Sequence, residues 1–499
     1  MSDSDWTTSS NDALVLSLVS PSPTGGLKTI TTFRPQFTYP IFGDEEQIFG
    51  YKDLRIQLRF HASDMRPNVQ VTFKDQFQAI GETEPTDIDG IMKEFLPEVA
   101  FQKVKSFTAA IQNVPEDWTP PGELVSTLNI SGSSTFGVWK GTLADPVVKQ
   151  IVNRIQILVP LYIEGGTALD LEDPDLDRWT VFFLYEKRPI PGEPNNYTYL
   201  FAGYCTVYAF YPFRAPVTPP ASPSPEFELG SSDFSLSQLP CRSRISQFLI
   251  IRPFQNKGLG PRLYAEVFKF YYAHPQTFEV TVEDPNEAFD DMRDIADLHF
   301  LRENLPEFNA LHIDTSIVIP KTGFAPKDIV DRAACEAVRQ KAKIAPRQFY
   351  RVLEMHLMSK LAKSVRPSVT AIEESQKKNK KAATPQEQHE YELWRLVVKK
   401  RIYVHNKDAL GQLDLKDRIE KLGETVDGVE FDFARLLSKA EGQRKRMLEE
   451  DASAVAAGVP TSNGKRKAED GGDDKAEDGN GQSNPKKARF ASSVEDAEV

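Results

Sequence analysis

The sequence predicts an α+β protein in which a mixed β-sheet is flanked by helices, and three observations support this fold class. A short apolar run at 248–251 is followed by a glycine turn, an amphipathic helix and a second strand at 278–282. Strand-like pieces alternate with polar turns between about residues 10 and 140. After about residue 325, helix-forming residues with amphipathic spacing dominate.

Composition and hydrophobic spacing divide the 499 residues into four regions. From the N-terminus, we expect an α+β lobe at 1–140, a central sheet domain at 141–325, a helical domain at 326–450 and a disordered tail at 451–499. The tail has almost no large apolar residues, so it cannot bury enough surface to fold. A proline- and serine-rich insertion at 213–243 interrupts the central domain, and no regular element is expected there.

Each folded region has its own expected elements. In the lobe, period-two apolar spacing predicts strands at 54–60 and 69–73. After a helical segment from about Asp145, three apolar runs predict core strands of the central sheet, at 155–159, 179–185 and 199–210. In the helical domain, amphipathic spacing predicts helices at 328–343, 347–363 and 386–404.

Charge and cysteine content exclude several classes of function. A net charge of −12 argues against general nucleic-acid binding and suits a strongly basic partner. The three cysteines form no Cys-x-x-Cys pair, and the seven histidines form no zinc motif, so we expect neither disulfides nor a metal. We expect no secretory signal, because the N-terminus is polar and acidic without a basic region that leads into an apolar core. We also expect no membrane span, because no apolar run is long enough.

The segment from Phe248 to Pro261 predicts a binding site for an anionic ligand. Pro253 ends the strand, and Gly258 and Gly260 let the backbone turn tightly. A helix that begins at Pro261 would direct free backbone N–H groups and the positive end of its dipole toward this turn. Phosphate groups are natural ligands of such a turn.

Two phosphate-binding motifs are excluded by the neighbouring residues. A dinucleotide fingerprint needs a third glycine where Leu263 stands, and a P-loop needs Gly-Lys-Ser/Thr where this chain has Gly-Pro-Arg. The remaining pattern is Gln255-x-x-Gly258-x-Gly260 after a strand. It resembles the acetyl-coenzyme A signature of the GNAT acetyltransferase superfamily.

Longer blocks are similar to a more specific family. They lie at 246–250, 253–258, 282–294, 48–52 and 178–187. These blocks resemble the type B histone acetyltransferase catalytic subunit and run in that family's order across roughly residues 10–320. The resemblance implies a GNAT-type mixed sheet and direct transfer of acetyl from acetyl-coenzyme A to lysines on the tail of newly made histone four, in chromatin assembly and DNA repair.

The resemblance also assigns cofactor-binding residues, around the glycine turn and the strand before it. They are Phe248, Leu249, Ile250, Gln255, Asn256, Lys257, Gly258, Leu259, Gly260, Pro261 and Asn286. A backbone N–H near 248–250 would stabilise the oxyanion. Asn286 has two open interpretations, because it also stands where the N-cap of the following helix is expected.

A carboxylate is expected as general base, because the lysine ammonium must lose a proton before its nitrogen attacks the thioester. Glu283 closes the strand at 278–282 and matches the base of the family. Asp284 and Glu186 are rivals for this role. For the substrate, an acidic loop and a strand are implied, with the residues Asp44, Glu45, Glu46, Tyr208 and Phe210.

The resemblance further implies partners and location. We expect the histone four tail, with histone three, and a WD-repeat β-propeller histone chaperone as partners, without membrane or direct nucleic-acid binding. Basic clusters at 465–467 and 485–489 resemble nuclear-import signals, so a cytoplasmic and nuclear protein is expected. Two alternatives stay open: an acetyltransferase acting on another amine, and a non-catalytic histone-binding adaptor.

Overall fold

The computed structural model describes residues 6–22, 24–115, 117–130, 134–190, 193–211, 239–320, 326–367, 369 and 382–456. The chain forms two compact units, Met1–Arg444 and Lys445–Val499. The predicted lobe, central domain and nearly all of the helical domain thus belong to one unit. Most of the insertion and both basic clusters lie outside the described residues. Within the described ranges, no helix is long and apolar enough to cross a membrane.

The lobe is built on a four-stranded sheet. Its strand order is β3 (Leu27–Phe33), β2 (Leu14–Pro21), β6 (Arg55–His61) and β7 (Pro67–Thr72), with β2 and β6 parallel. The strands predicted at 54–60 and 69–73 are β6 and β7, shifted by one or two residues. Smaller elements complete the lobe: β1 (Thr7–Ser9), α1 (Ser10–Ala13), α2 (Tyr39–Phe42), β4 (Gln47–Phe49), β5 (Tyr51–Lys52), β8 (Asp75–Gln76), α3 (Ile88–Phe95) and α4 (Val104–Gln112).

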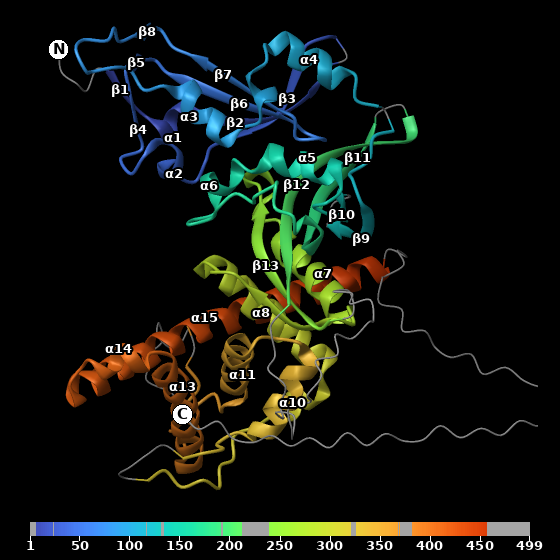
Figure 1. The fold of residues 1–499 in the computed structure, drawn as a ribbon. Helices are drawn as coiled ribbons and strands as arrows, with labels where there is room; N and C mark the ends of the chain where they lie inside the picture. Colours follow the sequence, from blue (N-terminus) through green and yellow to red (C-terminus); the bar gives the residue numbers. More distant parts are fainter. Residues whose placement is uncertain are drawn as a thin grey trace, which may run out of the picture. The chain divides into compact units, whose positions relative to one another are not determined.

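The central domain is built on a six-stranded mixed sheet (Figure 1). Its order is β14 (Thr277–Val282), β13 (Cys241–Ile250), β12 (Glu193–Phe210), β11 (Trp179–Ile190), β10 (Ser134–Thr142) and β9 (Glu123–Ile130). Only β13 and β14 run parallel. The predicted strands at 179–185, 199–210, 248–251 and 278–282 are therefore confirmed. β13 begins at Cys241, so the last three residues assigned to the insertion belong to a strand.

The strand predicted at 155–159 was wrong, because this segment is helical. It spans the end of α5 (Pro146–Ile155) and the start of α6 (Leu158–Tyr162). The carboxylate of Asp145 accepts hydrogen bonds from the N–H groups of Val147 and Val148, and proline at the first position suits a helix start. The apolar residues then repeat at helical spacing rather than alternating.

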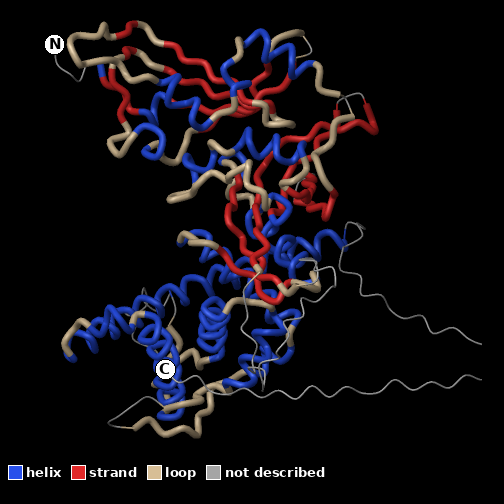
Figure 2. The backbone as a smooth tube through the Cα atoms, in the orientation of Figure 1, coloured by secondary structure: helices blue, strands red, loops and turns tan. Residues whose placement is uncertain are grey.

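One helix lies between the last two strands of the central sheet, and the other helices follow the last strand. α7 (Leu259–Ala273) joins β13 to β14, and α8 (Glu287–Asn304) follows β14. The predicted helices are confirmed as α10 (Arg332–Ala342), α11 (Pro346–Lys360) and α13 (Pro385–His405). Three further helices are α9 (Pro306–Ala310), α14 (Lys407–Gly411) and α15 (Leu415–Ala456). Figure 2 shows no strand in the described part of the predicted helical domain, 326–450. The last helix, α15, continues six residues past the predicted start of the tail.

The lobe is joined to the central sheet by buried polar contacts. The N–H of Phe201 on β12 donates to the carbonyl of Ala62, 2.8 Å away. Arg154 of α5 pairs with Asp64 at 2.9 Å, and both side chains are largely buried. Burial raises the pKa of Asp64, but the hydrogen bond from His61 and, to a smaller extent, the charge of Arg154 lower it to about 2. One hydrophobic core continues from the lobe through the sheet into the helices.

Candidate active site

β13 and β14 pair over only part of their lengths. Their last aligned residues are Ile245 and Val282, and the N–H of Glu283 donates to the carbonyl of Ile245 at 2.8 Å. Beyond this point β13 continues to Ile250 and pairs only with β12. Among the described residues, 246–250 therefore have one edge without a strand partner. An extended ligand can bind such an edge as an added strand does.

The glycine turn leads from the end of this open strand to the N-terminus of a helix. Asn256 and Gly258 both have positive φ, 60° and 72°, and Gly258 is the N-cap of α7. The helix begins at Leu259, two residues before the predicted Pro261, and no side chain caps it. Its first N–H groups and its dipole are thus available to an anion. A side chain at Gly260 would approach the sulfur of Met292 on α8 at 3.2 Å, so glycine lets the two helices pack closely.

The structure brings the predicted cofactor residues together around this turn. Asn256, Lys257 and Gly258 are exposed, whereas Leu249, Ile250 and Leu259 are buried and hold the turn in place. The amide of Gln255 donates to the carbonyl of Ile250 at 2.7 Å, which fixes the turn against the strand end. Pro261 lies in the first turn of α7.

Two of the predicted cofactor residues belong to the contact between β13 and α8. The half-buried Phe248 of β13 packs edge-on against Phe289 of α8, with ring centroids 5.2 Å apart. Asn286 is the N-cap of α8, and its side-chain oxygen accepts from the N–H of Phe289 at 2.9 Å. The N-cap interpretation is therefore confirmed, and the cofactor contact of Asn286 stays a prediction.

Glu283 stands at the end of β14, beside the open edge of β13. Its side chain is 40% exposed. The hydroxyl of Ser246 donates to Glu283 Oε2 at 2.8 Å, and Arg244 lies 3.7 Å from Oε1. Both partners are on β13, at positions whose side chains share one face of the sheet. This carboxylate is held in one orientation and is still reachable from solvent.

The two rival carboxylates differ in position. Asp284 directly follows Glu283, is exposed and has a positive φ of 33°. Glu186 lies on β11, which β12 and β13 separate from β14. It is only 8% exposed, and Arg188 forms two hydrogen bonds with it, at 2.6 and 2.9 Å. The geometry therefore groups Glu283 and Asp284 at the open edge and leaves Glu186 elsewhere.

The predicted substrate residues fall into two groups. Tyr208 and Phe210 share a face of β12, and Phe210 is 41% exposed. Tyr208 aligns with Arg244 on the neighbouring strand, so it lies on the same face as the partners of Glu283. Its hydroxyl accepts a hydrogen bond from Arg178 at 2.7 Å.

The acidic loop of the lobe forms the second group. Asp44 and Glu45 are exposed. Glu46 instead accepts hydrogen bonds from the N–H groups of Thr38 and Tyr39 at the start of α2, at 2.5 and 3.1 Å. The bond from the Thr38 backbone is the main cause that lowers the pKa of Glu46. Glu46 thus shapes the loop, and only the other two acids are exposed to a ligand.

Sequence reasoning missed Ser246 and Arg244. The sequence did contain a signal for them. Arg244 and Ser246 are alternate residues of one strand and so share a face, and the neighbouring parallel strand ends in Glu283. Within the ranges that the structure describes, no cluster of three or more His, Cys, Asp or Glu side chains could hold a metal ion.

The comparisons with known proteins point to one family. "Histone acetyl transferase HAT1 N-terminus" matches residues 6–164, and "Fungal HAT1, C-terminal" matches residues 321–362. The histone acetyltransferase type B catalytic subunit of Neurospora crassa is 52% identical over 94% of this chain and 95% of its own length. That of Gibberella zeae is 48% identical over 93% and 98%.

One solved structure is also similar in part. It is an aminoglycoside acetyltransferase from a soil metagenomic sample, 12% identical over 38% of this chain and 95% of its own, with a TM-score of 0.18 that is too low to carry an argument. The relatives match nearly the whole chain at high identity. The chain belongs to the family of histone acetyltransferase type B catalytic subunits and is an acyltransferase.

Proposed function

We propose that this enzyme transfers acetyl from acetyl-coenzyme A to lysine side chains on the N-terminal tail of newly synthesised histone four, in chromatin assembly. The single observation that carries the proposal is the placement of Glu283 at the point where β13 loses its partner strand. A proton acceptor lies there, the open strand edge 246–250 extends from it, and the chain then leads to the uncapped N-terminus of α7.

The chain's own elements suit each part of acetyl-coenzyme A. The pyrophosphate would bind the N–H groups at the start of α7, and the pantetheine arm would lie along residues 246–250. A backbone N–H near Phe248–Ile250 would stabilise the oxyanion that develops on the thioester carbonyl. Lys257 is exposed at the turn and adds a positive charge for the phosphates.

The proposed chemistry is direct transfer within a ternary complex. Glu283 accepts the proton of the lysine ammonium, and the neutral amine then attacks the thioester carbon. The C–N bond forms, the C–S bond breaks, and the coenzyme A sulfur leaves as a thiolate. The attacking nitrogen loses its second proton to solvent as the amide forms, and solvent protonates the thiolate. Because Glu283 is 40% exposed, it can return its proton to water between turnovers.

The substrate proposal is supported by charge. The protein is strongly acidic, and Asp44 and Glu45 are exposed in the lobe, which suits a lysine-rich tail. We include histone three and a WD-repeat β-propeller chaperone among the proposed partners. Action in both cytoplasm and nucleus is proposed from the basic clusters of the tail.

The test is release of free coenzyme A from acetyl-coenzyme A in the presence of a histone four tail peptide, followed with a thiol reagent. The matched control is the same peptide with every lysine replaced by arginine, which keeps the charge and removes the nucleophile. We expect release only with the lysine peptide. Equal release with a small-molecule amine would favour the other-amine alternative, and tail binding without release would favour the adaptor.

A further inference from the structure

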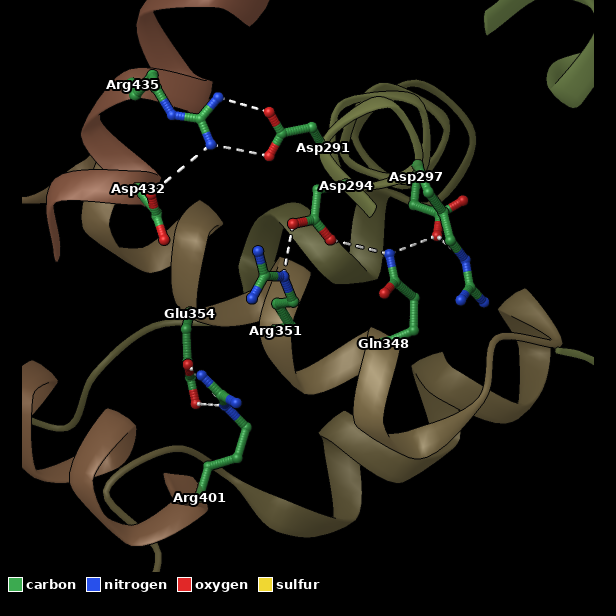
Figure 3. A network of polar contacts seen from close by, with 10 residues as sticks. Asp291, Asp294, Asp297, Gln348, Arg351, Glu354, Arg401, Asp432 and Arg435 are labelled. Carbon is green, nitrogen blue, oxygen red and sulfur yellow. Dashed lines mark hydrogen bonds and ion pairs between the residues drawn. The ribbon is translucent and has the colours of Figure 1, made fainter. Parts of the chain in front are cut away.

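α8 carries three aspartates whose carboxylates are hidden from solvent. Asp291, Asp294 and Asp297 are only 9%, 0% and 1% exposed, and their spacing of three residues keeps them close on the helix surface. A buried carboxylate is costly unless it is paired and hydrogen-bonded. Figure 3 shows that each of the three has a partner on another helix.

The two deeper aspartates connect α8 to α7 and α11. Asp297 accepts hydrogen bonds from Tyr264 of α7 at 2.7 Å and from Gln348 of α11 at 2.9 Å. Asp294 pairs with Arg351 of α11 at 2.5 Å. α7, which begins at the glycine turn, and α11 of the helical region are thus both bound to α8 through these aspartates.

The third aspartate connects α8 to α15. Arg435 makes two hydrogen bonds with Asp291, at 2.5 and 2.9 Å, in the fork arrangement that fixes both position and direction. The bond to Asp291 is the main cause that raises the pKa of Arg435. The positive charge is also stabilised by Asp432 of α15, 3.6 Å away, and by Glu287, the first residue of α8. A residue 144 positions away in sequence therefore holds the first turns of α8.

Those same turns contact the open strand edge 246–250 and the glycine turn with the start of α7, which together are called the cofactor cradle below. Phe289 packs against Phe248 of the open strand, and Met292 meets Gly260 in the first turn of α7. Asn286 caps the helix at this end. The first two turns of α8 are thus in contact with α15 through Arg435 and with the cradle through Phe289 and Met292.

We propose that Arg435 is a positioning residue for the binding of acetyl-coenzyme A. By holding Asp291 it sets the place of Phe289 and Met292, and these in turn set the open strand and the glycine turn. The helical region is then part of the cofactor site although it lies far from it in sequence. This inference rests on the proposed use of acetyl-coenzyme A.

The experiment compares the full-length protein with four variants, Arg435→Ala, Arg435→Lys, Asp291→Asn and the double variant that combines Arg435→Ala with Asp291→Asn. Arg395→Ala is the matched control, because Arg395 pairs with Glu430 and Asp427 between α13 and α15 and makes no described ion pair with α8. Calorimetry gives the Kd for acetyl-coenzyme A, and kinetics give KM and kcat separately.

We expect Arg435→Ala to raise Kd and KM for acetyl-coenzyme A about fivefold or more, with kcat at saturation retained. Arg435→Lys keeps the positive charge but cannot make the two parallel hydrogen bonds. Its Kd and KM should therefore lie between those of the wild type and those of Arg435→Ala. Asp291→Asn should resemble Arg435→Ala, and the double variant should add nothing further, because both remove one contact. The control should bind as the wild type does.

The outcomes separate the inference from the proposed function. A wild-type protein that does not bind acetyl-coenzyme A would overturn the proposed cofactor itself. Wild-type binding together with unchanged binding by Arg435→Ala would overturn only the inference. Equal weakening by Arg435→Ala and Arg395→Ala would also overturn it, because the effect would then be a general loss of stability. Arg435→Lys and Asp291→Asn keep the test open if the alanine variant does not fold.

Discussion

Glu283 and the three aspartates of α8 are carboxylates close together in sequence, yet their surroundings are opposite. Glu283 is 40% exposed and receives one short hydrogen bond, from Ser246. Asp294 and Asp297 have almost no exposed surface. They are surrounded by the guanidinium, amide and phenol groups of two other helices, α7 and α11.

This difference in exposure and pairing distinguishes a carboxylate that can act as a general base from carboxylates that stabilise the fold. A general base must reach the substrate and exchange its proton with water, so it cannot be fully paired. A structural carboxylate in the interior is stabilising only while its partners stay. Substitutions at the two places should therefore affect different quantities, turnover at the strand end and stability on α8.

The largest expected effect is on turnover. Glu283→Gln keeps the shape of the side chain and removes the proton acceptor, so kcat should fall about 10²- to 10⁴-fold while acetyl-coenzyme A binding and the melting temperature stay unchanged. Steady-state kinetics, calorimetry and thermal unfolding on one preparation measure the three quantities.

Asp284→Asn and Glu186→Gln are the controls for that substitution. Glu186 is already engaged by Arg188 and lies on a strand that two others separate from β14. Both controls should keep most of the activity. If either one loses more than Glu283→Gln does, the general base is that residue and the comparison between the two regions must be redrawn.

The next effect is on stability. Arg351→Ala leaves Asp294 buried without its cation, and removal of one partner from a buried pair typically costs about 3 kcal/mol. Arg244→Ala removes the cation near Glu283, where both side chains are 40% exposed, and should cost less than about 1 kcal/mol. Urea unfolding of both variants measures the contrast, and equal losses would contradict it.

The pH dependence of stability tests the same contrast at Asp297. Burial raises the pKa of this carboxyl to about 6, against the opposing effects of Arg293, Tyr264 and Gln348. Because the folded-state pKa lies above the unfolded one, its contribution to stability is complete below about pH 4 and is lost as pH rises through 6. The loss is up to about 3 kcal/mol.

Asp297→Asn isolates that contribution, because the amide resembles the protonated acid and does not titrate. The difference in unfolding free energy between variant and wild type should shift in favour of the variant from pH 4 to pH 7. A difference independent of pH would mean that Asp297 does not change protonation on folding. Denaturant unfolding at several pH values measures it.

Much of the fold was predictable because its signals are local. The strand, glycine turn and helix from 248 to 273 follow from β-branched residues, glycines and an apolar stripe that agree with one another. The failure at 155–159 shows the limit of this reasoning. A short apolar run does not distinguish a strand from a helix, and the capping aspartate and proline before it were the decisive signal.

The site was only partly predictable. Glu283 and the turn follow from motif and resemblance, whereas Ser246 required the register between two strands and Arg435 required the packing of helices far apart in sequence. Glu46 looked like its acidic neighbours, and only the hydrogen bonds of the folded loop separate it from them.

The smallest expected effect is at Ser246. Ser246→Ala removes one hydrogen bond to Glu283, worth about 1 kcal/mol, so kcat should fall about fivefold with KM for both substrates unchanged. Ser246→Thr keeps a hydroxyl and should restore most of the rate. An alanine variant with wild-type kcat would mean that the backbone of β14 alone orients the base. A loss rescued by threonine would mean that an exposed catalytic carboxylate, unlike a buried one, depends on a single weak contact to be in the right place.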